Sequence, residues 1–129
     1  MLDTNIVADL VRNPAGKAAS RLASIGDDAI AISIIVAAEI RFGLAKQASK
    51  SLSARVEQVL RVLPVIAFDS PADEHYGDIR NSLRKSGRMI GPNDLFIAAH
   101  ARALGVPLAT NHAAEFRRVE GLKVEDWLE

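Results

Sequence analysis

The chain has no cysteine, few aromatic residues and no long apolar run. Without cysteine it cannot form a disulfide, a thiolate zinc site, an iron–sulfur cluster or a thiol nucleophile. A membrane-spanning helix needs about 18 or more consecutive apolar residues, and the N-terminus lacks the basic, apolar and small-residue order of a secretory signal. Aromatic residues make up only 5% of the chain, too few for a base-stacking platform. We therefore expect a cytoplasmic protein with no membrane association.

Several common catalytic motifs are also missing. Neither the G-x-G-x-x-G pattern of dinucleotide-binding folds nor the G-x-x-x-x-G-K-[ST] phosphate loop occurs. No serine lies in a G-x-S-x-G context. The three histidines, His75, His100 and His112, lack the i, i+4 spacing of a helical zinc site, so we expect them to be surface or packing residues.

The composition is that of one globular domain. The 129 residues are 49% hydrophobic and 25% charged, close to the average for folded domains. A chain of this length buries roughly two thirds of its unfolded surface. No internal repeat or flexible linker interrupts it, so we expect a single domain over residues 1–129.

Short β-prone segments alternate with segments of helical periodicity, which predicts an α/β fold with a parallel sheet covered by helices on both faces. Strands are expected at residues 1–3, 29–33, 65–68, 106–110 and, more weakly, 122–125. Helices are expected at residues 14–26, 34–48, 51–62, 71–87 and 92–104. Only two residues precede Asp3, so the first strand is either truncated or vestigial.

Capping residues support these helix boundaries. Asn13 and Pro14 are a typical cap and first-turn pair. Either Ser51 or Ser53 is expected to open the third helix, and Gly105 to close the last one.

Three carboxylates lack the partners that their positions would normally provide. Asp3 ends the first strand, where ligands bind in open α/β sheets. Glu39 follows five consecutive apolar residues and has no cation at helical spacing, and Asp94 has none either. Two of these acids also have a local explanation, since Asp3 can cap the following helix and Asp94 suits a helix N-terminus. Together with Glu115, which can equally be a surface acid, they predict an all-oxygen site suited to Mg²⁺ or Mn²⁺.

The net charge of zero hides a segregation of charge along the sequence. Bases predominate in residues 41–61 and 79–118, whereas acids gather in residues 69–78 and at the C-terminal end. This pattern fits either ordinary solvated helix faces or a basic rim around an acidic centre that binds a polyanion.

Four motifs in order resemble the PIN domain, and most closely the VapC-type toxins of bacterial toxin–antitoxin pairs. They are L-D-T-N at 2–5, A-A-E-I-R-F-G at 37–43, G-R-M-I-G-P-N-D-L-F-I-A-A-H-A at 87–101 and A-T-N-H-A-A-E-F at 109–116. The resemblance implies a three-layer domain in which helices flank a central, mostly parallel sheet of four to five short strands. It also implies that Asp3, Glu39 and Asp94 hold one or two Mg²⁺ or Mn²⁺ ions for RNA cleavage.

The resemblance leaves the fourth acidic position open. Many relatives place Asp or Asn two residues after the threonine of the last central strand, where this chain has His112. Asn111 and Glu115 are the other candidates, and we count Glu115 among the catalytic acids.

The resemblance further implies roles for neighbouring residues. Asp3 and Asp94 would be direct metal ligands, and Glu39 would be a ligand or a base acting through water. Thr4 or Asn5 would donate a supporting hydrogen bond. Basic side chains would bind flanking phosphates: Arg41, Arg88 and Arg102.

By the same resemblance, the partners are an RNA substrate and a small VapB-type antitoxin that inserts a segment into the active-site groove. The toxin would be a homodimer and would meet DNA only through the antitoxin. The alternative is a non-cleaving PIN-like subunit of a DNA-bound regulatory complex. Phosphoaspartyl chemistry at Asp3 fits poorly, because Asn5 stands where such phosphatases need a second aspartate.

Overall fold

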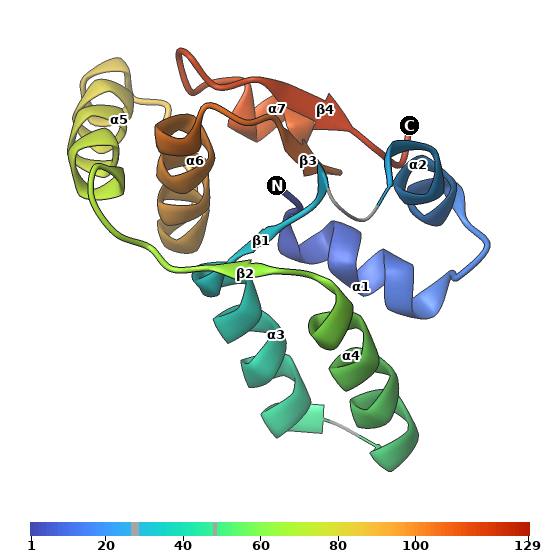
Figure 1. Ribbon diagram of the computed structural model, residues 1–129. Helices are drawn as coiled ribbons and strands as arrows, with labels where there is room; N and C mark the ends of the chain where they lie inside the picture. Colours follow the sequence, from blue (N-terminus) through green and yellow to red (C-terminus); the bar gives the residue numbers. More distant parts are fainter. Residues whose placement is uncertain (27–28, 48) are drawn as a thin grey trace.

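The computed structural model describes residues 1–26, 29–47 and 49–129 of the chain (Figure 1). In chain order the elements are α1 (Thr4–Arg12), α2 (Lys17–Ile25), β1 (Ile32–Ser33), α3 (Ile34–Gln47), α4 (Lys50–Val62), β2 (Val65–Ile66), α5 (Ala72–Ser86), α6 (Pro92–Leu104), β3 (Leu108–Thr110), α7 (Ala113–Phe116) and β4 (Val124–Asp126).

All strand pairings of the described residues are parallel. β1 pairs with β2, and β3 pairs with β4. Leu2 lies between the two pairs, because its backbone forms a parallel bridge with Ala109 and its N–H donates to the carbonyl of Ala31 at 3.0 Å. The strands therefore follow the order β2, β1, Leu2, β3, β4, which confirms the predicted parallel sheet of short strands. The first strand is reduced to the bridge at Leu2.

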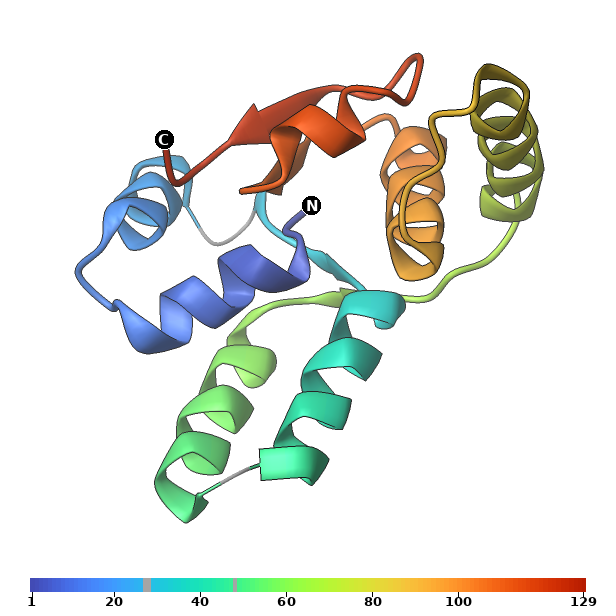
Figure 2. The same ribbon diagram turned by 180° about the vertical axis from the view of Figure 1, so that it is seen from behind.

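Helices surround these strands. Both views show α5 and α6 side by side at one end of the molecule and α1 with α2 at the other (Figures 1 and 2). α3 and α4 extend away from β1 and β2, and α1 packs against α3 and α4. Among the described residues, no helix is long and apolar enough to cross a membrane.

The core is built where α1 and α6 meet the strands. Ile6 of α1, Ile32 of β1, Ile97 of α6, Leu108 of β3 and Phe116 of α7 have no exposed surface. α6 is buried through its middle, where Leu95 and the residues from Ile97 to Ala101 face the core. Since its first turn carries Asp94, the core fixes the position of that carboxylate.

The boundaries of α6 and the end of α5 match their prediction. α6 begins at Pro92 and is closed by Gly105, whose φ of +69° is a left-handed conformation that suits glycine. α5 likewise ends at Gly87. The strands are shorter than predicted, and the four-residue helix α7 was not predicted, because one turn is too short to show periodicity.

Two predicted caps were wrong. α2 begins at Lys17 after Gly16, because Asn13 instead closes α1, where its side-chain amide donates to Asp9 at 2.7 Å. α4 begins at Lys50, and its cap is Ser49, whose hydroxyl accepts the N–H of Leu52 at 3.1 Å. The predicted third-helix caps Ser51 and Ser53 lie inside α4. The predicted end of the preceding helix, at residue 48, lies outside the described residues.

Candidate active site

Asp3 lies at the carboxyl end of the Leu2 bridge and caps α1. Its side chain is buried, with only 3% of the residue exposed. One carboxylate oxygen accepts the Thr4 N–H at 2.8 Å, and the other accepts the Thr110 hydroxyl at 2.8 Å. Burial raises the pKa of Asp3, and the charge of Glu39 adds to that rise against the lowering effect of the two hydrogen bonds. The capping role weighed for Asp3 is thus confirmed.

Glu39, on α3, is held from two other helices. The hydroxyl of Thr4 donates to one carboxylate oxygen at 2.6 Å, and the amide of Asn93 donates to the other at 3.4 Å. A hydrogen-bonded row therefore joins β3, α1, α3 and α6 through Thr110, Asp3, Thr4, Glu39 and Asn93.

Asp94 is the third residue of α6, where the helix dipole favours an acid. Its carboxylate folds back toward Gly91, where a Cβ would lie 3.3 Å from the Asp94 Oδ2 atom. Burial raises the pKa of Asp94 to about 6, and the charges of Asp3, Glu39 and Glu115 contribute to the rise. The structure thus places Asp3, Glu39 and Glu115 close enough to Asp94 for their charges to raise its pKa.

No basic side chain in the described ranges forms an ion pair with this cluster of four acids. The ion pairs there are Arg21–Glu125, Arg41–Glu57 and Arg102–Asp78, and none includes a member of the cluster. Among the described residues, His112 is the only cationisable group whose charge lowers the pKa of both Asp3 and Asp94.

The donor set of the cluster suits Mg²⁺ or Mn²⁺, because all of its side chains offer carboxylate oxygens and lack ion-pair partners in the described ranges. Nevertheless, no three acids or imidazoles in the described part of the chain stand close enough together to hold one ion. Like charges repel, so these carboxylates need not converge as they stand. The prediction of a shared ion position for Asp3, Glu39 and Asp94 stays a prediction.

The candidates for the fourth position lie around α7. Glu115 is half-buried, whereas Asn111 and His112 are exposed. The backbone N–H of His112 donates to the Thr110 hydroxyl at 2.9 Å, and its ring Nε2 lies 3.4 Å from the Asn5 amide nitrogen.

Of the two predicted supporting donors, Thr4 contacts an acid and Asn5 contacts His112 instead. The sequence reasoning missed Thr110 and Asn93. Thr110 could have been found as a polar residue at the carboxyl end of a central strand, the same signal that pointed to Asp3. Asn93 had no signal besides its position next to Asp94.

The three predicted phosphate-binding arginines have different surroundings. Arg41 pairs with Glu57, and Arg88 is exposed. Arg102 lies at the end of α6 opposite Asp94 and donates to three groups. These acceptors are Asp78 at 2.7 Å, His75 at 2.8 Å and the carbonyl of Glu120 at 2.9 Å. Arg102 thus ties α6 to α5 and to the loop before β4, and its predicted contact with phosphate stays a prediction.

The remaining histidines are packing residues, as predicted. His100 is buried, and its Nδ1 lies 2.8 Å from the hydroxyl of Ser33. His75 accepts the hydrogen bond from Arg102.

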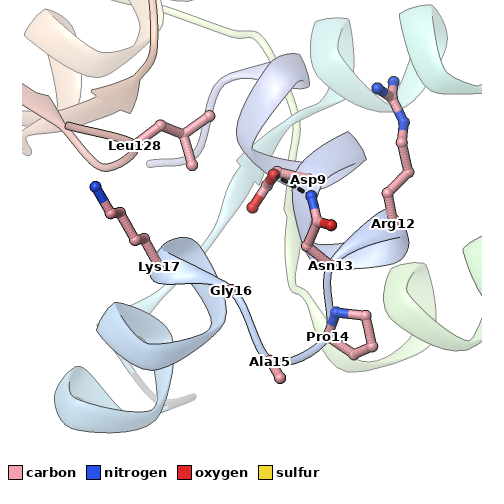
Figure 3. A pocket seen from close by; sticks show the side chains of 8 residues that line it. All are labelled: Asp9, Arg12, Asn13, Pro14, Ala15, Gly16, Lys17 and Leu128. Carbon is pink, nitrogen blue, oxygen red and sulfur yellow. Dashed lines mark hydrogen bonds between the residues drawn. The ribbon is translucent and has the colours of Figure 1, made fainter.

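Among the described residues, two of the cavities that α1 lines differ in their relation to the acids. An open pocket of about 590 Å³ occupies the corner between α1 and α2, where Asp9, Arg12 and Lys17 line it, and it contains none of the four acids (Figure 3). A smaller groove of about 230 Å³ begins at Thr4 and Glu39. It runs between α1, α3 and α4 along mostly apolar side chains: Val7, Val11, Ile40, Leu44, Leu52 and Val56.

Comparison with known proteins agrees with this arrangement. The family model described as PIN domain matches residues 1–122. The chain is 36% identical over 128 residues to the tRNA(fMet)-specific endonuclease VapC of Shigella flexneri, covering 98% of this chain and 96% of that protein. It is 36% identical over 129 residues to ribonuclease VapC2 of Rickettsia felis, again covering 98% and 96%.

Solved structures give the same result. A chain of the VapBC2 crystal structure from Rickettsia felis, bound to a promoter DNA fragment, superposes with a TM-score of 0.92 at 35% identity, covering 98% of this chain and 97% of that one. A chain of DNA-bound VapBC from Salmonella typhimurium superposes with a TM-score of 0.91 at 34% identity, covering 98% and 96%. The motifs, the parallel fold and the whole-length matches all agree, and the chain belongs to the PIN domain family, among its VapC-type ribonuclease toxins.

Proposed function

We propose that this protein is a Mg²⁺- or Mn²⁺-dependent endoribonuclease that hydrolyses RNA phosphodiester bonds as the toxin of a toxin–antitoxin pair. The observation that carries the proposal is the cluster of four acids near the carboxyl end of the central strands, of which Asp3 and Glu39 are held by hydrogen bonds and none has an ion-pair partner among the described residues. Such a cluster needs a cation to become favourable. The names of the relatives support cleavage over a non-cleaving regulatory subunit.

Each acid has a role that follows from its surroundings. Asp3 and Asp94 would bind the metal directly, because Asp3 caps α1 and Asp94 lies in the first turn of α6, which places both carboxylates at helix N-termini within the cluster. Glu39, oriented by Thr4 and Asn93, would be a third ligand or the base that receives a proton from water. Glu115 would complete the set. A bound Mg²⁺ or Mn²⁺ supplies an activated water and neutralises charge on the phosphate.

The partner would be a small VapB-type antitoxin. The apolar groove that begins at Glu39 suits an inserted segment that ends at the acids. Matching chains come from VapBC complexes, two of them with DNA, which supports contact with DNA through the antitoxin. We further propose a homodimer, and a cytoplasmic location because the substrate is RNA.

Cleavage across a Mn²⁺ titration tests the proposal. Glu39→Gln and Asp94→Asn should each lose cleavage of single-stranded RNA at low Mn²⁺, because each removes a charge from the cluster. Rescue of Glu39→Gln by high Mn²⁺ would mark Glu39 as a ligand, and failure of rescue would mark it as the base. Asp73→Asn, which neutralises an exposed acid on α5, is the control and should keep wild-type rates. Wild-type rates in both cluster variants would overturn the proposal.

A further inference from the structure

His112 lies at the edge of the acid cluster, outside the hydrogen-bonded row that runs from Thr110 to Asn93. Its backbone is fixed there, since its N–H donates at 2.9 Å to the same Thr110 hydroxyl that donates to Asp3. Its ring is exposed, and Nε2 lies 3.4 Å from the side-chain amide of Asn5 on α1. The imidazole is therefore held at the solvent side of the cluster by two contacts.

An RNA strand that approaches four acids meets electrostatic repulsion at the reacting phosphate. A metal ion among the carboxylates offsets part of it, and a cationic group beside them would offset more. The arginines of the described ion pairs are engaged with other acids, and Arg102 lies at the far end of α6. His112 lies beside the acids instead: its Nε2 is 3.4 Å from the side-chain amide of Asn5, two residues after Asp3, and its backbone N–H contacts the same Thr110 hydroxyl as Asp3.

We propose that His112, oriented by Asn5, contacts a phosphate oxygen of the RNA next to the acid cluster. The inference rests on the proposed ribonuclease function. It assigns His112 to the substrate rather than to the metal, because its ring is exposed and lies beside Asn5 rather than beside a carboxylate of the cluster. Imidazole N–H donors suit phosphate oxygens, and the contact positions RNA without reading its sequence.

The test compares His112→Ala, His112→Lys and His112→Phe with wild type on a mixed-sequence single-stranded RNA. Loss of one charge-assisted hydrogen bond at an exposed site should raise KM about fivefold to tenfold in His112→Ala, with kcat within about twofold of wild type. His112→Lys should restore most of the lost affinity, because lysine also binds phosphate. Lys123→Ala, which removes an exposed cation beyond the opposite end of β3, is the control and should leave KM unchanged.

Calorimetry with Mn²⁺ alone separates this inference from the proposed function. The His112→Ala variant should bind Mn²⁺ as tightly as wild type. Weaker Mn²⁺ binding would make His112 a ligand and overturn the inference, as would an unchanged KM or rescue by phenylalanine, which indicates stacking on a base. A wild-type protein that neither binds Mn²⁺ nor cleaves RNA would instead overturn the proposed function.

Discussion

Asp94→Asn should stabilise the metal-free protein at neutral and alkaline pH while it abolishes cleavage. In the folded protein, burial and three neighbouring acids raise the pKa of Asp94 from its ordinary 3.8 to about 6. A pKa difference of one corresponds to about 1.4 kcal/mol, so ionised Asp94 costs the fold at most about 3 kcal/mol above pH 6, and less where solvent screens its charge. Because the amide that replaces the carboxyl group cannot ionise, the variant avoids this cost.

The sign of the pH dependence follows from the raised pKa. Between pH 3.8 and about 6 the folded protein binds the Asp94 proton more tightly than the unfolded chain, so the wild type loses stability as pH rises through this window. The stability gain of Asp94→Asn should therefore be about 1–3 kcal/mol at pH 8 and should vanish near pH 3.5. Urea unfolding in EDTA measures it at both pH values. A variant that is less stable than wild type at pH 8, or equally stabilised at both, would refute the electrostatic reasoning.

Three further predictions concern residues around the cluster. Thr4→Val keeps the shape of the side chain but removes the hydrogen bond to Glu39. The kcat should therefore fall about tenfold or more in single-turnover kinetics, and the free energy of unfolding in urea should fall by about 1 kcal/mol. Gly91→Ala places a methyl group 3.3 Å from the Asp94 carboxylate, so Mn²⁺ affinity by calorimetry should fall while helicity by circular dichroism is kept; equal affinity would show that the carboxylate moves freely. The lysine of Arg102→Lys cannot bond all three acceptors, so the variant should lose about 1–3 kcal/mol of stability in urea unfolding without a change in KM for RNA. A raised KM would show that Arg102 contacts the substrate.

Local signals were sufficient for much of the fold. Pro92 and Gly105 fix both ends of α6 by backbone conformation alone, which is why these boundaries match. Asn13 and Ser51 carried equally good capping chemistry, but Asn13 closes α1 and Ser49 caps α4, and helix boundaries are hard to place to within one or two residues. Strand lengths depend on pairing between distant segments, so they could not be read from one segment.

The acids of the site were visible in the sequence because each lacked a local partner. Their hydrogen-bond donors were not, since Thr110 and Asn93 meet Asp3 and Glu39 only across 107 and 54 positions of the chain. The acceptors of Arg102 were hidden for the same reason. Its acceptors lie on α5 and in a distant loop, and nothing in its own helix shows that they occupy it.

A crystal structure of the protein grown with Mn²⁺, read by anomalous scattering, tests the central claim most directly. The account predicts a strong Mn²⁺ peak at bonding distance, about 2.0–2.2 Å, from carboxylate oxygens of Asp3 and Asp94, with Glu39 drawn toward the same ion directly or through water. A protein that cleaves RNA under these conditions but shows no Mn²⁺ peak at the acid cluster would contradict it.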